Sequence, residues 1–260
     1  MKIIKFLTAG ESHGELLMGI LEGIPSNLEI DEKYIYNQLQ RRQLGFGRGK
    51  RMQIENDYAK IYTGVRFGKT LGSPIGMMIK NNDWKNWKRK MSIESLDTEV
   101  KKITLPRPGH ADLAGVLKYD FDDIRNVIER SSARETAMRV AIGSVCRKLL
   151  DYFNIYIGSY VSSIYKAKDK QDYSQLSSQE INKKADKSPV RSLDKKVEKE
   201  MINHITTAKD NGDSVGGSFN IIVQGVPYGL GSYISWNSKL NSRLGEAILS
   251  INGIKSVSIG

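Results

Sequence analysis

The sequence predicts an α+β protein whose 260 residues allow one large domain or two small ones, and of these we expect a single domain over residues 1–260. Three observations support this prediction: β-compatible apolar segments dominate the N-terminal part, amphipathic patterns of helical period follow, and a strand-turn-strand-helix pattern occurs twice. A chain of 260 residues is also long enough to bury a sizeable core.

Each expected element follows from the spacing of its apolar residues and from the turn residues that flank it. Strands are expected over residues 3–9, 15–24, 58–65, 75–79 and 155–165. Helices are expected over 31–43, from the S-x-x-E pattern of Ser132 and Glu135 onward, over 193–211 and over 239–251. The polar stretch 80–104 is expected to be a surface loop or short helix, and 166–190 a solvated insertion or mobile linker.

The apolar faces of the last three expected helices are predicted to enter the core. They comprise Met138, Ala141, Ile142, Val145 and Leu149 in the first, Val197, Met201, Ile205 and Ala208 in the second, and Leu240, Leu244, Ala247, Ile248 and Ile251 in the third.

An internal repeat relates residues 10–28 to residues 212–230 without a gap. The identical pairs are Gly10/Gly212, Ser12/Ser214, Gly14/Gly216, Ile20/Ile222, Gly23/Gly225, Pro25/Pro227 and Leu28/Leu230. We interpret the two copies as equivalent strand-turn-strand-helix units, an arrangement compatible with pseudo-twofold symmetry. Equal halves would place the end of the second unit past residue 260, so we expect the second half to be incomplete.

Charge and cysteine content narrow the classes of function. The 40 Lys and Arg residues exceed the 29 Asp and Glu residues by 40 − 29 = 11, which favours a phosphorylated substrate, a nucleotide cofactor or nucleic acid as partner. The single cysteine, Cys146, excludes an intrachain disulfide, and three histidines leave little material for a metal site. Because no apolar run approaches the ~18 residues of a membrane span, we expect a cytoplasmic protein without a membrane partner.

Two histidines are candidates for proton transfer near neutral pH. His13 lies in the glycine-flanked turn GESHG between two expected strands, where a ligand can approach the backbone closely. His110 lies in PRPGHAD, near Arg107 and Asp112, so it can act beside a bound anion. The alternatives are a histidine hydrogen-bonded within its turn for His13, and a loop histidine paired with Asp112 for His110.

Two arginine-rich segments are candidate anion sites. Arg130 to Arg134 stands at an expected helix start, where free N–H groups and hydroxyls can hold phosphate or a flavin edge. Arg41, Arg42, Arg48 and Arg51 flank a glycine-rich turn, and their guanidinium groups match phosphate or carboxylate. Solvated arginines, with Ser132 acting only as a cap, are the alternative. GFGRGK is neither a P-loop nor a dinucleotide-binding fingerprint.

Six motifs in order resemble the chorismate synthase family over essentially the whole chain: GESHG, RRQLGFGRGKRMQIE, RPGHADL, ERSSARETAMRVA, GDSVGG and GLGSY. The resemblance implies a β-α-β sandwich, a homotetramer, and the trans-1,4-elimination of phosphate from 5-enolpyruvylshikimate 3-phosphate to give chorismate in the shikimate pathway. It also implies a requirement for reduced FMN, although the reaction has no net redox change.

The same resemblance assigns site residues. It implies that His13 protonates reduced flavin and that His110 protonates the departing phosphate. Substrate-binding residues would be Arg48, Arg51, Arg107 and Arg134; flavin-binding residues would be Arg130, Ser131, Ser132, Asn252 and Gly253, the last standing where alanine is common. Arg42 and Arg48 also match positions that contact NADPH in members that reduce their own flavin.

Family members extend further at the C-terminus, so we expect a truncated chain with impaired activity. Two alternatives stay open at this point. One is an inactive pseudoenzyme or fragment that keeps flavin binding or an assembly surface. The other is a basic nucleic-acid-binding protein, although RRM, KH and helix-turn-helix signatures are absent.

Overall fold

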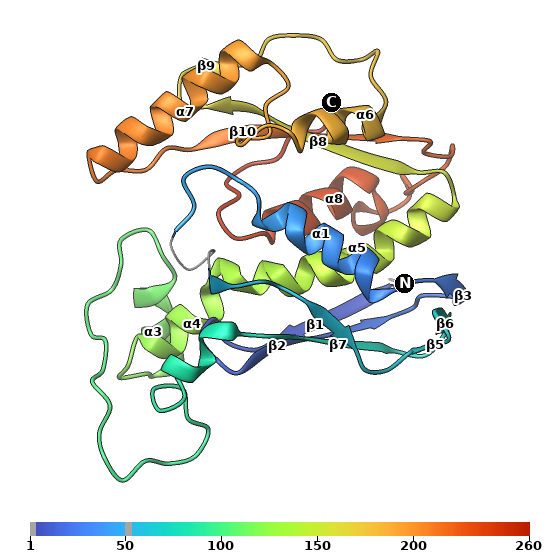
Figure 1. The fold of residues 1–260 in the computed structure, drawn as a ribbon. Helices are drawn as coiled ribbons and strands as arrows, with labels where there is room; N and C mark the ends of the chain where they lie inside the picture. Colours follow the sequence, from blue (N-terminus) through green and yellow to red (C-terminus); the bar gives the residue numbers. More distant parts are fainter. Residues whose placement is uncertain (1–3, 50–53) are drawn as a thin grey trace. The chain divides into compact units, whose positions relative to one another are not determined.

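The computed structural model describes residues 4–49 and 54–260 and confirms a mixed helix and sheet architecture (Figure 1). Its contacts group these residues into two compact units. The first contains residues 4–39, 54–144 and 228–260, and the second contains 40–49 and 145–227. The single-domain organisation stays a prediction.

An antiparallel sheet of the order β1-β2-β7-β4 forms the centre of the first unit. Its strands are β1 (Lys5–Ala9), β2 (Leu16–Glu22), β4 (Ala59–Ile61) and β7 (Ile75–Lys80). One face carries fully buried side chains, namely Leu17 and Leu21 of β2 and Ile75, Met77 and Ile79 of β7. Burial at every second residue is typical of a strand with one covered face.

The part of helix α5 (Thr136–Tyr152) up to Ser144 covers that face of the sheet (Figure 1), and its residues from Val145 onward belong to the second unit. A Cβ at Gly19 of β2 would lie 2.6 Å from Sδ of Met138 and 2.8 Å from Cδ1 of Ile142, so glycine permits the close approach of helix and strand. Met138, Ala141, Ile142 and Val145 are buried as predicted, and Leu149 is half-buried.

The remaining elements of the first unit surround this sheet and helix. A second sheet has the order β3-β6-β5, formed by β3 (Ser26–Glu29), β5 (Val65–Arg66) and β6 (Lys69–Leu71). The helices are α1 (Glu32–Gln43, whose last residues belong to the second unit), α3 (Asp112–Tyr119), α4 (Arg125–Ser131) and α8 (Leu240–Leu249), with short 3-10 turns at Asn82–Asn86, Ala133–Glu135 and Trp236–Ser238.

Two predictions about helices in this unit are wrong. No residue of α8 is buried, and Leu240 and Leu244 keep exposed fractions of 40% and 39%, so the amphipathic face is not core in this chain. The capping box of Ser132 and Glu135 does not form either. The hydroxyl of Ser132 accepts from the N–H of Arg134, whereas the carboxylate of Glu135 accepts from Thr8 and from Arg139.

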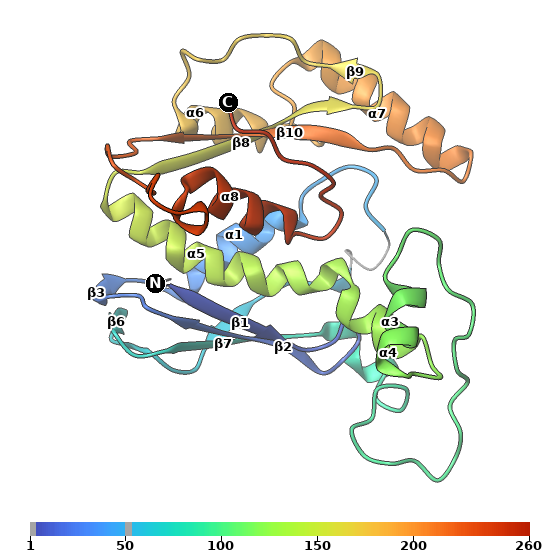
Figure 2. The same cartoon turned by 180° about the vertical axis from the view of Figure 1, so that it is seen from behind.

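The second unit contains the antiparallel sheet β10-β8-β9, with α6 (Ser178–Ala185) and α7 (Lys195–Asp210) packed on one face (Figure 2). Its strands are β8 (Tyr156–Ile164), β9 (Ala167–Lys168) and β10 (Gly217–Gln224). Met201 of α7 is fully buried in a cluster with Ala167 and Val190. Strand β10 lies at the edge of this sheet, and its Phe219, Ile221 and Val223 stay exposed.

The stretch 166–190 differs from the expected solvated insertion. It contains β9 and α6, and Ile181 and Ala185 pack fully buried against Tyr160 of β8. Ser177 and Glu180 form a complete capping box at the start of α6. This helix was not predicted, because its composition is polar overall and only one narrow face is apolar.

The repeat is preserved in part. Each copy has a strand, β2 or β10, followed by a glycine with positive φ, 91° at Gly23 and 78° at Gly225, and later by a helix, α1 or α8. Residues 228–231, opposite β3 in the alignment, contain no strand. Within the described residues no helix has the length and apolar character needed to cross a membrane.

Candidate functional site

His13 lies in the turn between β1 and β2, as predicted, and it is held by Glu129 of α4. Its Nδ1 lies 2.9 Å from both carboxylate oxygens of Glu129, and its backbone N–H donates to Oε2 at 2.7 Å. The N–H of Ser12 donates to the carbonyl of Glu129 at 2.9 Å. One residue of α4 therefore fixes both the turn and the imidazole ring.

The imidazole ring of His13 is stacked on Trp87, with ring centroids 3.8 Å apart and an angle of 22° between the planes. Trp87 is itself anchored because its Nε1 donates to Asp83 at 2.8 Å. The guanidinium group of Arg125 lies 5.4 Å from the Trp87 centroid and 4.0 Å from the Glu129 carboxylate. These contacts fix the plane of the ring as well as one of its nitrogens.

The junction of α4 with the turn before α5 is connected by hydrogen bonds to the end of β1 and to the segment after α8. Arg130 donates to the carbonyls of Thr8 at 2.8 Å and Gly10 at 3.2 Å. The hydroxyl of Ser132 donates to that of Ser12 at 3.1 Å. Asn252 follows α8, and its side-chain amide donates to the carbonyl of Ser131 at 2.8 Å. The two stretches predicted to bind flavin therefore lie side by side.

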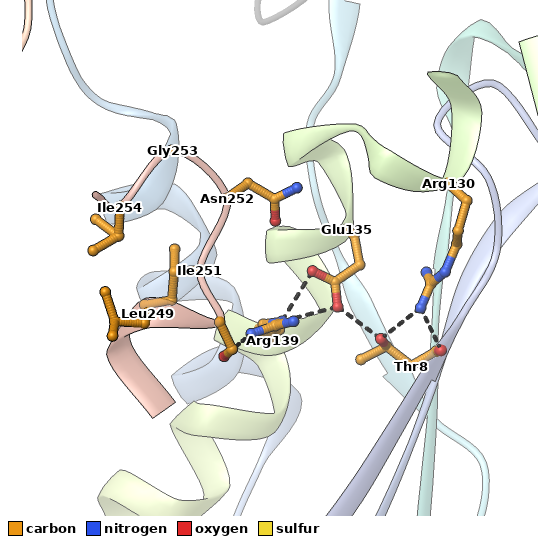
Figure 3. A pocket seen from close by; sticks show the side chains of 10 residues that line it. Thr8, Arg130, Glu135, Arg139, Leu249, Ile251, Asn252, Gly253 and Ile254 are labelled. Atoms are coloured by element: carbon orange, nitrogen blue, oxygen red, sulfur yellow. Dashed lines mark hydrogen bonds and ion pairs between the residues drawn. The ribbon is translucent and has the colours of Figure 1, made fainter. Parts of the chain in front are cut away.

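A polar cavity of about 430 Å³ opens at this place (Figure 3). Three residues predicted from the sequence line it, Arg130, Asn252 and Gly253. Its other lining residues, which sequence reasoning did not single out, are Thr8, Glu135, Arg139, Leu249, Ser250, Ile251 and Ile254. The Arg139 guanidinium is paired with Glu135 at 2.9 Å and donates to Ser250 at 2.8 Å. The volume lies in the range of small-molecule sites, and the guanidinium and amide groups suit an anionic or carbonyl-bearing ligand.

Arg134 is buried, with an exposed fraction of 7%. Its Nη1 lies 2.5 Å from Asp57, its Nη2 lies 3.5 Å from Glu55, and its Nε donates to Asn81 at 3.0 Å. The sequence interpretation in which both arginines of this segment face water is therefore wrong for Arg134. Two carboxylates already balance its charge, and substrate binding by Arg134 stays a prediction.

Arg107 forms a two-pronged ion pair with Asp112 at the start of α3. Nε and Nη2 of Arg107 donate to the two carboxylate oxygens at 2.8 and 2.9 Å, and its backbone N–H donates at 2.9 Å. These hydrogen bonds lower the pKa of Asp112 to about 2 and raise the pKa of Arg107. His110 is exposed, and its Nδ1 lies 2.9 Å from the carbonyl of Pro108, so Asp112 pairs with Arg107 rather than with His110.

The remaining predicted arginines lie in the second unit or outside the described residues. Arg48 is exposed in the loop after α1, and Arg42 is half-buried near the end of that helix. Arg41 is paired with Asp186 at 2.8 Å. Arg51 lies outside the described residues. Within residues 4–49 and 54–260, no three His, Cys, Asp or Glu side chains are grouped to hold a metal ion.

His13 is fixed by the buried carboxylate of Glu129, and the next residue, Arg130, lines a cavity with cationic side chains. Enzymes use sites of this kind for acid-base chemistry on anionic small molecules. The family model that describes chorismate synthase matches residues 4–260. The chain therefore belongs to the chorismate synthase family.

Individual relatives agree with this assignment. A chorismate synthase of Alkaliphilus metalliredigens is 52% identical over 258 residues, which cover 99% of this chain and 67% of the relative. A chorismate synthase of Aquifex aeolicus is 49% identical and is covered to the same 67%. A crystal structure of chorismate synthase matches 98% of this chain and 68% of its own, with a TM-score of 0.80 and 40% sequence identity.

Proposed function

We propose that this chain catalyses the trans-1,4-elimination of phosphate from 5-enolpyruvylshikimate 3-phosphate to give chorismate, with reduced FMN as cofactor. Family membership over residues 4–260 carries the proposal. The closeness of the two predicted flavin-binding stretches, joined by the bond from Asn252 to Ser131, supports the position of the cofactor. In the reaction a C–O bond to phosphate breaks, a proton leaves the far end of the 1,4-related unit, and a diene forms.

The two histidines supply the proton transfers in this proposal. His13, with Nδ1 directed to Glu129, would supply a proton to reduced flavin bound beside it. His110 is exposed in the loop before α3, where its imidazole donates a proton to the departing phosphate. General acid catalysis of this kind contributes roughly 10²- to 10⁴-fold to a rate.

The arginines bind and orient the substrate in this proposal. Arg48, Arg51, Arg107 and Arg134 are assigned to its phosphate and carboxylate groups. Guanidinium groups stabilise the negative charge that gathers on phosphate as it leaves. The ion pair with Asp112 holds Arg107 rigidly, so little side-chain entropy is lost when the substrate binds. The net charge of +11 agrees with a site for several anionic groups.

The residues of the cavity fit a flavin cofactor. The cavity is lined mainly by polar groups, among them those of Arg130, Asn252 and Arg139, which suit the phosphate and the polar edge of a flavin. Arg130, Ser131, Ser132, Asn252 and Gly253 would hold the group there. Reduced FMN supplies electron density that helps to expel phosphate, while the protein positions the substrate and excludes water.

Three further properties belong to the proposal as family expectations: a homotetramer, a cytoplasmic location, and NADPH as flavin reductant bound at Arg42 and Arg48.

Neither the inactive pseudoenzyme nor the nucleic-acid-binding protein gains support from the relatives. Flavin binding without turnover would favour the former, and steep salt-dependent binding to DNA or RNA without a flavin spectrum would favour the latter.

An anaerobic assay of histidine variants tests the proposed roles. The chain is incubated with reduced FMN and substrate, and chorismate is quantified by chromatography. We expect His13→Ala and His110→Ala to lower kcat by roughly 10²- to 10⁴-fold. His204→Ala is the matched control, because His204 lies on α7 in the second unit, and it should keep kcat within about twofold. Equal kcat in all three variants would remove both histidines from the mechanism.

A further inference from the structure

We propose that Glu129 is a positioning residue that keeps the proton of neutral His13 on Nδ1, so that Nε2 is the nitrogen that gains and loses a proton. The catalytic consequence rests on the proposed function, whereas the assignment of the proton rests on the geometry of the first unit alone. Glu129 opens the motif ERSSARETAMRVA, but the family resemblance assigns no role to it.

In its hydrogen bonds with Glu129, His13 must supply the donors. An ionised carboxylate only accepts hydrogen bonds. Both of its oxygens lie 2.9 Å from Nδ1, and Oε2 also accepts the backbone N–H of His13 at 2.7 Å. Nδ1 must therefore carry a proton to complete its contact. In a neutral imidazole this leaves Nε2 as the acceptor, because the ring carries only one N–H.

Burial makes this arrangement rigid. The exposed fraction of the Glu129 side chain is 2%, and Arg125 lies 4.0 Å from its carboxylate, so a cation balances the charge inside the first unit. The backbone of the same residue accepts from Ser12 at 2.9 Å. A change at Glu129 therefore acts on the imidazole ring and on the turn that carries it.

Trp87 fixes the remaining freedom of the ring. Its indole stacks on the imidazole at 3.8 Å, and its bond to Asp83 holds the indole in place. A half-turn of His13 about its Cβ–Cγ bond would exchange Nδ1 for a carbon at Glu129 and lose that hydrogen bond, and the angles in between would break the stacking. A ring fixed at one nitrogen and on one face presents Nε2 in a constant direction, which is the condition for efficient proton transfer.

The test is a direct observation of the imidazole proton by nitrogen-15 NMR on the full 260-residue chain. The chain has only three histidines, so His110→Asn and His204→Asn assign the spectrum. In the spectrum of the neutral imidazole of His13, we expect the pattern of an Nδ1–H ring in the unsubstituted chain. Glu129→Gln replaces one oxygen by an N–H donor, and we expect the pattern to shift toward Nε2–H. Glu15→Gln, an exposed glutamate in the same turn, should leave it unchanged.

Activity provides the second measurement. We expect Glu129→Gln to lower kcat by roughly 10- to 100-fold in the anaerobic assay, with the Kd for FMN unchanged within about twofold. Glu129→Asp keeps the charge and should recover part of the loss. An Nε2–H pattern in the unsubstituted chain overturns the inference even if Glu129→Gln does not fold. A shift in the pattern without a fall in kcat, or a fall without a shift, also overturns it.

The two measurements separate this inference from the proposed function. Absence of turnover by the unsubstituted chain counts against the proposed function, and the NMR pattern still decides whether Glu129 fixes the proton. Turnover together with an Nε2–H pattern keeps the function and rejects the role of Glu129.

Discussion

Replacing Arg134 by Met tests whether the buried ion-pair cluster stabilises the first unit. The change removes the contacts of Arg134 with Asp57 at 2.5 Å, Glu55 at 3.5 Å and Asn81 at 3.0 Å. Asp57 is 0% exposed and Glu55 is 4% exposed, so both carboxylates lose a counter-charge where water cannot replace it. Breaking a buried pair by removing one partner costs about 3–5 kcal/mol in the free energy of unfolding. With a urea m-value of about 2–3 kcal/mol/M, the urea concentration at the unfolding midpoint should fall by about 1–2.5 M.

Tryptophan fluorescence reports this unfolding selectively. The three tryptophans are Trp84, Trp87 and Trp236, and all of them lie in the first unit. Arg243→Met is the control because Arg243 is exposed on α8 of the same unit, and it should move the free energy of unfolding by less than about 0.5 kcal/mol. A midpoint for Arg134→Met within experimental error of the control would refute the reasoning. Arg134 would then contribute little to the free energy of unfolding, and its main role would be to bind the substrate.

Two further predictions concern acid stability and backbone geometry. The pKa of Asp112 is lowered from 3.8 to about 2, chiefly by its hydrogen bonds from Arg107, so its ion pair stabilises the fold above about pH 4 and this contribution is lost as the pH falls toward 2. Asp112→Asn should flatten the decline in stability between those pH values, and an unchanged acid profile would contradict the assignment. Gly225→Ala should destabilise the second unit by roughly 1–3 kcal/mol in thermal unfolding, because φ is +78° and a Cβ would lie 2.0 Å from the carbonyl oxygen of Asn154. Gly143→Ala, where space is open in α5, is its control.

Local patterns predicted the elements that bury one regular face. The apolar segments that form β2 and β7 and the helical spacing in α5 correspond to buried residues in the structure. The same type of pattern failed for α8, because amphipathicity shows that a face can be buried and not that another element covers it. For 166–190, the prediction followed the overall polarity of the segment and overlooked the S-x-x-E pattern of Ser177 and Glu180. This pattern marks the start of α6.

The candidate site was predictable where residues are close in sequence, as in the turn of His13. Contacts between distant segments were not predictable. Glu129 is 116 residues away from His13, and no spacing rule connects a glutamate in a short helix with a turn between two strands. The two carboxylates that contact Arg134 were missed for the same reason. The sequence around an arginine at a helix start does not show whether the arginine binds a ligand or pairs with buried acidic residues. Arg130 and Asn252, which the resemblance assigns to flavin binding, line one cavity, and their binding role stays a prediction.

The central claim is that this chain eliminates phosphate without net oxidation or reduction, and product stoichiometry tests it most directly. The chain is incubated anaerobically with substrate and a catalytic amount of reduced FMN, and chorismate, inorganic phosphate and the flavin spectrum are measured together. We predict equal amounts of chorismate and phosphate, many turnovers per flavin, and flavin that is still reduced at the end. Absence of chorismate, or formation of one oxidised flavin for each product, would contradict the account.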